Sequence, residues 1–278
     1  MKRTIIAGAA VMLAAASTFA ATRVHQITGP VTSVTVNRGI DVDYIPMQGE
    51  NNVTVSGPDN FVALVQVNQK GGALEITLNT PSGQRVKLPK DLRCTLKLPA
   101  VSTISATSSG DIHVRGTYSI SNLAVNSTSS GDIDFDEISS TANVSLTSSS
   151  SGDIKVNRLR AANLSAVSNS SGDIEVKASN LSNASLKASS SGDIALNNSN
   201  VTNVMADCNS SGDIELKNIT AKFLILSTSS SGEIEASGAA TAIKATASSG
   251  GVINLEKLSG NLQESNASSG GRIKAPRR

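Results

Sequence analysis

The chain has 278 residues, with 24 Lys and Arg, 22 Asp and Glu, two Cys, no Trp and 2% aromatic residues. Two of the basic residues, Lys2 and Arg3, stand at the extreme N-terminus, so the rest of the chain is balanced at 22 basic and 22 acidic residues. A balanced charge without a basic block excludes nucleic-acid binding, and two cysteines exclude a small fold held by several disulfides.

Residues 1–20 have the three regions of a secretory signal peptide. Met1, Lys2 and Arg3 form a basic start, residues 5–16 are apolar, and small residues precede a cleavage site after Ala20. The apolar run is shorter than the roughly 20 residues that a transmembrane helix needs. We therefore expect export to the periplasm or cell surface of a Gram-negative bacterium, with no membrane span after cleavage.

Residues 21–105 have strand patterning without a regular repeat. Aliphatic residues alternate with polar ones and are separated by Gly, Pro and Asn turn signals. No stretch has helical periodicity. The segment is predicted to form irregular first β coils or a distinct β-sandwich-like cap, because the terminal repeats of stacked proteins are atypical. The alternating pairs include Val34/Val36, Val53/Val55, Leu74/Ile76 and Leu96/Leu98.

Residues 106–278 contain nine copies of a motif based on Ser-Ser-Gly-Asp-Ile. The glycines that align these copies recur about every 20 residues, and a fixed period of this length indicates a stacked repeat architecture. The aligned glycines are Gly110, Gly131, Gly152, Gly172, Gly192, Gly212, Gly232, Gly251 and Gly271.

The residues around each glycine alternate between apolar and polar, which predicts strands with one buried face. Counted from the glycine, aliphatic side chains recur at −8, −6, +2 and +4, and small side chains, mostly Ser, recur at −4 and −2. Both sets are expected to point inward, the small ones where the interior narrows at the Ser-Ser-Gly bend. Disordered low-complexity tracts lack such periodic apolar positions, so this Ser- and Asn-rich region is predicted to be folded.

Each unit is expected to hold two strands, with one bend at Ser-Ser-Gly and another beyond +5. One unit cannot bury its own apolar face, whereas stacked units can. The predicted fold class is therefore all-β, a right-handed parallel β-solenoid. Glycine at the bend suits either a positive φ or a close approach of neighbouring coils. Buried hydroxyls at the bend need partners, either a Ser ladder or the bend backbone.

Several segments together resemble a known family. They are the runs 39–44 and 53–60, then 72–76, then Leu96-Lys97-Leu98-Pro99, followed by the Ser-Gly-Asp-Ile coils. This combination resembles the autotransporter-adhesin head GIN domain family, a domain of unknown function common in Bacteroidetes, and is similar to other export-associated β-solenoid domains. The resemblance covers nearly all of residues 22–278. It implies a β-helix in the periplasm or at the cell surface and supplies no catalytic residues.

An acidic column follows the glycines at position +1 and is the candidate site. Stacked carboxylates about 4.8 Å apart repel one another, by roughly 1 kcal/mol per pair in water. A row of Ca²⁺ ions could offset this repulsion. The interpretation we favour is that each carboxylate accepts backbone N–H groups at its own turn, with no metal or cofactor. The column is Asp111, Asp132, Asp153, Asp173, Asp193, Asp213 and Glu233.

The expected function is non-catalytic: a solenoid that presents binding surfaces in the cell envelope, with an adhesin-like role as one form of it. Its partner would be an envelope or extracellular protein or a glycan. The alternative is a polysaccharide-active β-helix enzyme, but a regular acidic column lacks the local break that an active site makes. Only His25 and His113 are present, and His113 is expected to be solvated. Cys94 and Cys208 are predicted to be free thiols, because several coils separate them.

Overall fold

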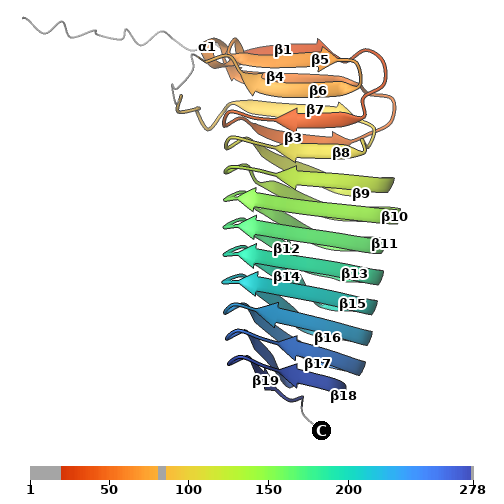
Figure 1. Ribbon diagram of the computed structural model, residues 1–278. Helices are drawn as coiled ribbons and strands as arrows, with labels where there is room; N and C mark the ends of the chain where they lie inside the picture. Colours follow the sequence, from red (N-terminus) through yellow and green to blue (C-terminus); the bar gives the residue numbers. More distant parts are fainter. Residues whose placement is uncertain (1–19, 81–85, 277–278) are drawn as a thin grey trace, which may run out of the picture.

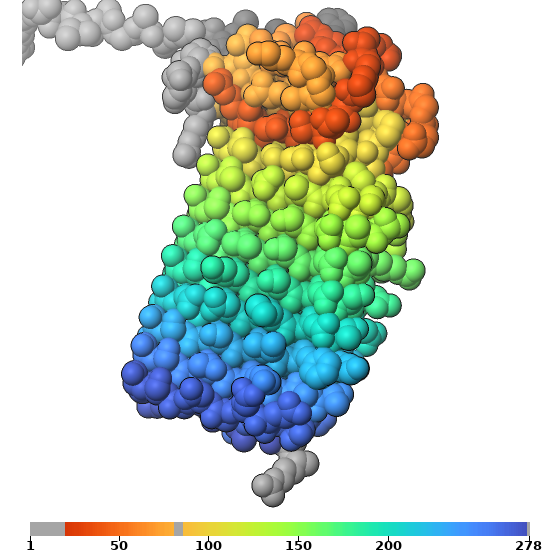
Figure 2. All heavy atoms as spheres, turned by 45° about the vertical axis from the view of Figure 1, so that its right-hand side comes forward, coloured from red at the N-terminus to blue at the C-terminus, as the bar shows by residue number. Residues whose placement is uncertain are grey.

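The computed structural model describes residues 20–80 and 86–276, so the predicted signal peptide, apart from Ala20, lies outside the described residues. The chain forms a parallel β-solenoid of about nine turns with about 20 residues per turn. Figure 1 shows the strands stacked one above another along a single long axis. In Figure 2 the regular coils, from yellow-green to blue, follow one another along that axis, whereas the red and orange segments of the N-terminal part are mixed at one end. The predicted fold class is confirmed.

The N-terminal part is built of short strands and one helical turn. Its elements are β1 (Ala20–Gln26), β2 (Ser33–Val36), β3 (Asp41–Pro46), β4 (Asn52–Pro58), α1 (Asp59–Val62), β5 (Val65–Lys70), β6 (Ala73–Leu78), β7 (Arg93–Leu98) and β8 (Thr103–Ala106).

Pairing in the N-terminal part is mixed. Strand β4 lies between β1 and β7 and is antiparallel to both, and β5 and β6 form an antiparallel hairpin. Strand β2 pairs in parallel with β6 and β8, and β3 pairs in parallel with β7 and β9. The N-terminal segment therefore combines parallel pairings, like those of the coils, with antiparallel pairings that are absent from the regular coils. The stack continues from β8 into β9 without interruption, and the division at residues 105 and 106 remains a proposal.

The regular coils use longer strands. They are β9 (Asp111–Ser127), β10 (Ile133–Ser150), β11 (Ile154–Ser170), β12 (Ile174–Val176), β13 (Ser179–Ser190), β14 (Ile194–Asn197), β15 (Ser199–Ser210), β16 (Asp213–Ser229), β17 (Glu233–Ala247), β18 (Val252–Ala267) and β19 (Arg272–Lys274). Two coils, β12 with β13 and β14 with β15, have the two separate strands that were expected. In β10, β11 and β16 a single strand continues through the second bend.

Equivalent residues of successive coils pair in register. Ile154 pairs with Ile174, Ile174 with Ile194, and Ile194 with Ile214. The side chains at −8, −6, +2 and +4 of the coils between β9 and β17 are buried, as the alternation predicts. Stacking therefore produces one continuous aliphatic core in which each residue lies on its equivalent.

The Ser-Ser-Gly bend shows where the −4 and −2 side chains point and which groups the buried hydroxyls bind. The −4 side chain is buried as expected, and the hydroxyls of Ser127, Ser148 and Ser168 donate to the carbonyl of their own coil's glycine. The −2 serines were expected inside but are exposed. All nine of them have a positive φ, between 48° and 65°, which turns the chain outward: Ser108, Ser129, Ser150, Ser170, Ser190, Ser210, Ser230, Ser249 and Ser269.

The motif glycine is required by close approach and not by a positive φ. A Cβ atom on Gly152 would lie 2.6 Å from the Gly131 carbonyl oxygen and against the Ser127 hydroxyl of the preceding coil. Real Cβ contacts are not this short, so any larger residue would push the coils apart. The glycine thus allows the close approach of the coils, and the −2 serine adopts the left-handed backbone conformation.

An aromatic stack joins the N-terminal part to the first coils. The rings of Tyr44 and Phe135 each lie edge-to-face with Tyr118, with both centroid distances 5.6 Å. The Tyr118 hydroxyl donates to the Val101 carbonyl at 2.7 Å and accepts from the Val101 N–H at 2.6 Å. Because all three rings are buried, the junction is a packed part of the same core.

Candidate functional site

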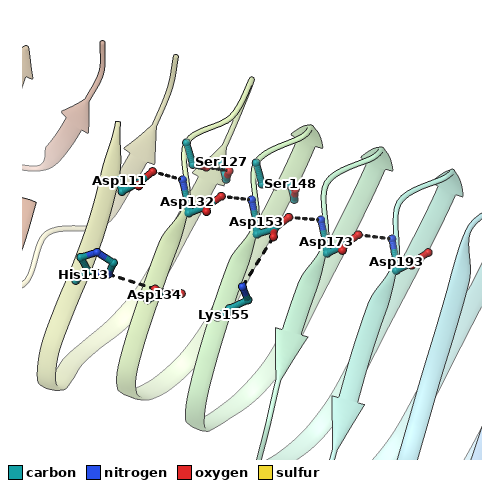
Figure 3. Close-up of polar contacts among 12 residues, drawn as sticks. Asp111, His113, Ser127, Asp132, Asp134, Ser148, Asp153, Lys155, Asp173 and Asp193 are labelled. Atoms are coloured by element: carbon teal, nitrogen blue, oxygen red, sulfur yellow. Dashed lines mark hydrogen bonds and ion pairs between the residues drawn. The ribbon is translucent and has the colours of Figure 1, made fainter. Parts of the chain in front are cut away.

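The acidic column forms a hydrogen-bonded ladder (Figure 3). The carboxylates of the column from Asp111 to Asp193 each accept the backbone N–H of the equivalent Asp one coil further along, and not an N–H of their own turn as was expected. The parallel register brings this N–H within reach, because equivalent bends stack directly on one another. The N–H to carboxylate distances, for donors Asp132, Asp153, Asp173, Asp193 and Asp213, are 2.9, 3.0, 3.1, 3.3 and 3.0 Å.

The carboxylates of the ladder provide hydrogen-bond acceptors for backbone N–H groups at the bends. Burial raises the pKa of Asp173 and Asp193, and the neighbouring carboxylate adds to the increase in each, while the accepted N–H bond opposes it. The ladder ends at Glu233, whose N–H donates to the Gly212 carbonyl at 3.2 Å. Within residues 20–80 and 86–276, no group of three or more His, Cys, Asp or Glu side chains is arranged to hold a metal ion.

His113 is half-buried and paired, which corrects the expectation of a solvated side chain. Its Nδ1 lies 3.2 Å from the Asp134 carboxylate. The hydrogen bond to Asp134 raises the pKa of His113, although burial opposes the increase, and the same bond lowers the pKa of Asp134. Arg115 binds Asp43 on the neighbouring strand at 2.9 Å. These pairs link β9 to β3 and β10 and stabilise the junction.

A groove runs along the stack on the face formed by the second half of each coil. Its volume is about 840 Å³, and it extends from Ser102 to Gln263. We call it the axial groove. Two columns of outward side chains line it, at positions −9 and −7 from the motif glycine. The −9 column consists of Asn122, Asn143, Asn163, Asn183, Asn203, Phe223 and Ala242, and the −7 column consists of Ala124, Ser145, Ser165, Ser185, Met205, Ile225 and Lys244.

The five asparagines of the −9 column form what we call the Asn ladder. Each Nδ2 donates to the Oδ1 of the asparagine on the preceding coil, at 2.8, 2.9, 2.8 and 2.7 Å along the series. An amide has two N–H donors and two acceptor lone pairs, so one of each remains for a ligand or for water. Covering such a group without replacing its hydrogen bond costs about 1–3 kcal/mol. The ladder therefore favours a ligand that carries hydroxyl groups.

The axial groove becomes apolar toward its C-terminal end, before it reaches Lys244 and Gln263. Met205, Phe223 and Ile225 are 54%, 43% and 45% exposed. Met205 pairs with Ile225 across β15 and β16, and Phe223 follows Asn203 in its column. The Lys222 ammonium lies 5.4 Å from the centre of the Phe223 ring. The −9 and −7 columns thus change along the groove from amide and hydroxyl groups to three large apolar side chains. Between the two columns, apolar −8 side chains such as Leu164 also line the groove.

The asparagine period was visible in the sequence at the same spacing as the glycines. It was missed because a polar residue on an outward position is the default for a solvated face. What sets this column apart is the break in its pattern at Phe223, where an exposed aromatic residue ends the run of asparagines.

Both cysteines are free and buried, as predicted. Cys94 lies on β7 and Cys208 on β15. Burial raises the pKa of each thiol to about 12. A buried, un-ionised thiol is a poor nucleophile and a poor metal ligand, so both side chains serve as small apolar groups in the core.

Comparison with known families gives one match that covers most of the chain. Residues 30–202 and 184–276 match the family described as "Putative auto-transporter adhesin, head GIN domain". No curated relative matches the chain.

Several solved structures share the fold. A protein from Parabacteroides distasonis described as a putative lipid binding protein is 19% identical, with a TM-score of 0.69 over 91% of this chain and 95% of the other. A putative adhesin from Parabacteroides merdae is 15% identical, with a TM-score of 0.62 over 90% of this chain and 95% of the other. At these identities the likeness extends to the fold alone.

Proposed function

Because the chain belongs to the auto-transporter adhesin head GIN domain family, we propose that it is a non-catalytic, exported β-solenoid that binds an external partner through the axial groove. One observation carries this proposal. Three of the five exposed large hydrophobic side chains in the described residues, Met205, Phe223 and Ile225, lie together in the groove. Clustered exposed apolar side chains mark interaction surfaces, whereas single ones need no explanation.

The signal-peptide pattern of residues 1–20 and the adhesin-like family support the export part of this proposal. In the described residues, no helix is long and apolar enough to cross a membrane. Expression of the full chain in a Gram-negative host, followed by mass measurement of the purified protein, tests this step. Cleavage after Ala20 is expected, and an intact N-terminus would contradict it.

A binding role fits the acidic column better than a polysaccharide-active enzyme does. Catalysis by two carboxylates needs groups in distinct environments, one protonated and one ionised. Here successive Asp side chains repeat one environment, each accepting the next coil's N–H. We propose that the column is a structural ladder and not a row of Ca²⁺ sites.

The experiment that tests the proposed function measures retention of the mature protein on immobilised bacterial envelope material. The double substitution Phe223→Ser and Ile225→Ser is expected to abolish most of the binding. Val24→Ser is the control, since Val24 is also exposed, at 51%, but does not line the groove.

Thermal melts of all three proteins accompany the measurement, and surface substitutions of this kind are expected to leave the melting temperature nearly unchanged. Unaltered retention of the groove variant would contradict the proposal. So would an equal loss in the Val24→Ser control, because the loss would then follow from general stickiness.

A further inference from the structure

The dimensions of the axial groove restrict what can occupy it. From Ser102 to Gln263 the groove crosses nine successive levels of the stack, so eight rises of about 4.8 Å give a length of about 38 Å. It is open to solvent along this length and follows the stacking axis. The groove therefore suits one extended chain that runs along the stack.

The charge of the lining restricts the occupant further. Every lining residue from Ser102 to Ile225 is uncharged. The charged residue at the C-terminal end, Lys244, pairs with Glu264. An anionic or cationic polymer would lose hydration along the groove without gaining an ion pair, so a neutral chain is favoured.

The Asn ladder distinguishes between neutral chains. A hydrocarbon chain over Asn143, Asn163 and Asn183 would leave an amide donor and an acceptor unpaired at each level. A polypeptide advances by about 3.3 Å per residue, out of step with amides about 4.8 Å apart. A pyranose unit in an extended glycan advances by nearly one coil, so its hydroxyl groups could meet one asparagine after another.

The apolar end of the groove agrees with this assignment. Sugar rings carry C–H faces that pack on aromatic side chains, and such contacts require an exposed ring beside hydrogen-bonding groups. Phe223 is the exposed aromatic residue in the −9 column, directly after Asn203. Met205 and Ile225 extend the same apolar surface to the −7 column.

With the axial groove taken from the proposed function as the binding surface, we infer that its ligand is a neutral, linear glycan that lies along the stacking axis. About eight sugar units fill its length at one unit per coil. The hydroxyl groups exchange hydrogen bonds with the Asn ladder, and one ring packs on Phe223.

The test is titration calorimetry of the mature protein with neutral oligosaccharides. The probes are cello-, laminari-, xylo-, manno- and malto-oligosaccharides of increasing length. At least one series is expected to bind, with an affinity that increases with chain length until the groove is filled. Asn163→Ala and Phe223→Ala are each expected to weaken binding about tenfold, which corresponds to about 1.4 kcal/mol.

Matched controls separate local contacts from general effects. Asn180 is an exposed asparagine on the same solenoid that does not line the groove, so Asn180→Ala is expected to bind like the wild type. Polygalacturonate and phosphatidylcholine vesicles, the charged and lipid probes, are expected not to bind.

Three results would overturn the inference: no binding in any of the five series, equal affinity of the groove variants and the wild type, or preference for the vesicles or polygalacturonate. Failure of the ligand class can be told from failure of the proposed function. If envelope retention is lost in the groove variants while no neutral glycan binds, the groove is the binding surface and only the ligand class is wrong.

Discussion

Strands of the regular coils pair with the next coil along the chain, whereas most strands of the N-terminal part, apart from the β5–β6 hairpin, pair across long stretches of sequence. Ile154 pairs with its equivalent Ile174, but Ser33 on β2 pairs with Thr103 on β8, and the strands β3 to β7 lie between them in the sequence. Stability in a nearest-neighbour stack is approximately a sum of repeat and interface contributions. An interleaved region can form only as a whole. The two regions therefore share one core but should differ in how far a local defect spreads.

The largest expected effect comes from removing a core side chain in each region. Leu96 on β7 and Leu196 on β14 are both fully buried. Leu96→Ala and Leu196→Ala should each lower the free energy of unfolding by about 2–5 kcal/mol. Hydrogen exchange should differ between them: accelerated amides lie within adjacent coils for Leu196→Ala and across β1–β9 for Leu96→Ala.

The same exchange pattern in both variants would remove the distinction between additive coils and an interleaved cap. A wild-type exchange profile under identical conditions is the reference for each.

A smaller effect is expected from crowding the bend between two coils. Gly152→Ala places a Cβ 2.6 Å from the Gly131 carbonyl oxygen, and the resulting overpacking should cost about 3 kcal/mol in urea unfolding. Gly116 serves as the control, because no atom lies within 4 Å of its Cβ position and only its φ of +77° opposes a side chain. Gly116→Ala should cost about 1 kcal/mol. Equal costs would mean that coil approach does not select glycine.

A still smaller effect is expected in the acidic ladder. The Asp173 carboxylate accepts the Asp193 N–H at 3.3 Å. Asp173→Ala removes that acceptor and should cost about 1 kcal/mol. Asp173→Asn keeps an acceptor oxygen and removes a charge that its neighbours repel, so its urea midpoint should equal or exceed that of the wild type. Strong destabilisation by Asp173→Asn would instead favour a bound cation as the reason for the acidic column.

The smallest effect is a pH dependence at the junction of the two regions. The hydrogen bond to Asp134 raises the pKa of His113, so protonated His113 stabilises the folded state. This contribution is complete below the unfolded pKa of about 6.5 and is lost as the pH rises through the folded pKa. His113 should therefore raise the melting temperature at pH 6 relative to pH 8, by the equivalent of less than about 1 kcal/mol for a partly exposed pair.

His113→Gln should reduce that difference. The control is His25→Gln: burial lowers the pKa of His25, so this variant should change the difference in the opposite direction. A steeper pH dependence in His113→Gln would contradict the assignment.

Features that repeat with the coil could be predicted from the sequence. The glycine period, the inward aliphatic positions and the buried side chains at −4 follow from alternation and stacking. The pairing of β2 with β8 could not be predicted, because no local sequence pattern indicates a partner strand so far along the chain. The exposure of Ser129 and the other −2 serines also escaped prediction. Simple alternation places them inside, and only the positive φ of the bend turns them outward.

The donor to each carboxylate escaped prediction for a related reason. Asp132 can accept an N–H from its own turn or from the next coil, and the choice depends on the register of Asp132 and Asp153 across the stack. The groove likewise depends on which outward columns become neighbours.

The central claim is that each repeat unit is one interchangeable coil, and that stacking these units makes both the core and the groove continuous. Deletion of residues 173–192 joins Gly172 to Asp193 and brings Ile154 opposite Ile194, so every column stays in register. Deletion of residues 173–182 removes half a coil and breaks all of them. The two deletion variants are compared by thermal unfolding, with circular dichroism as the signal. A folded, β-rich protein with a modestly lower melting temperature is expected for the whole-coil deletion and extensive unfolding for the half-coil deletion, whereas equal loss of structure in both would contradict the claim.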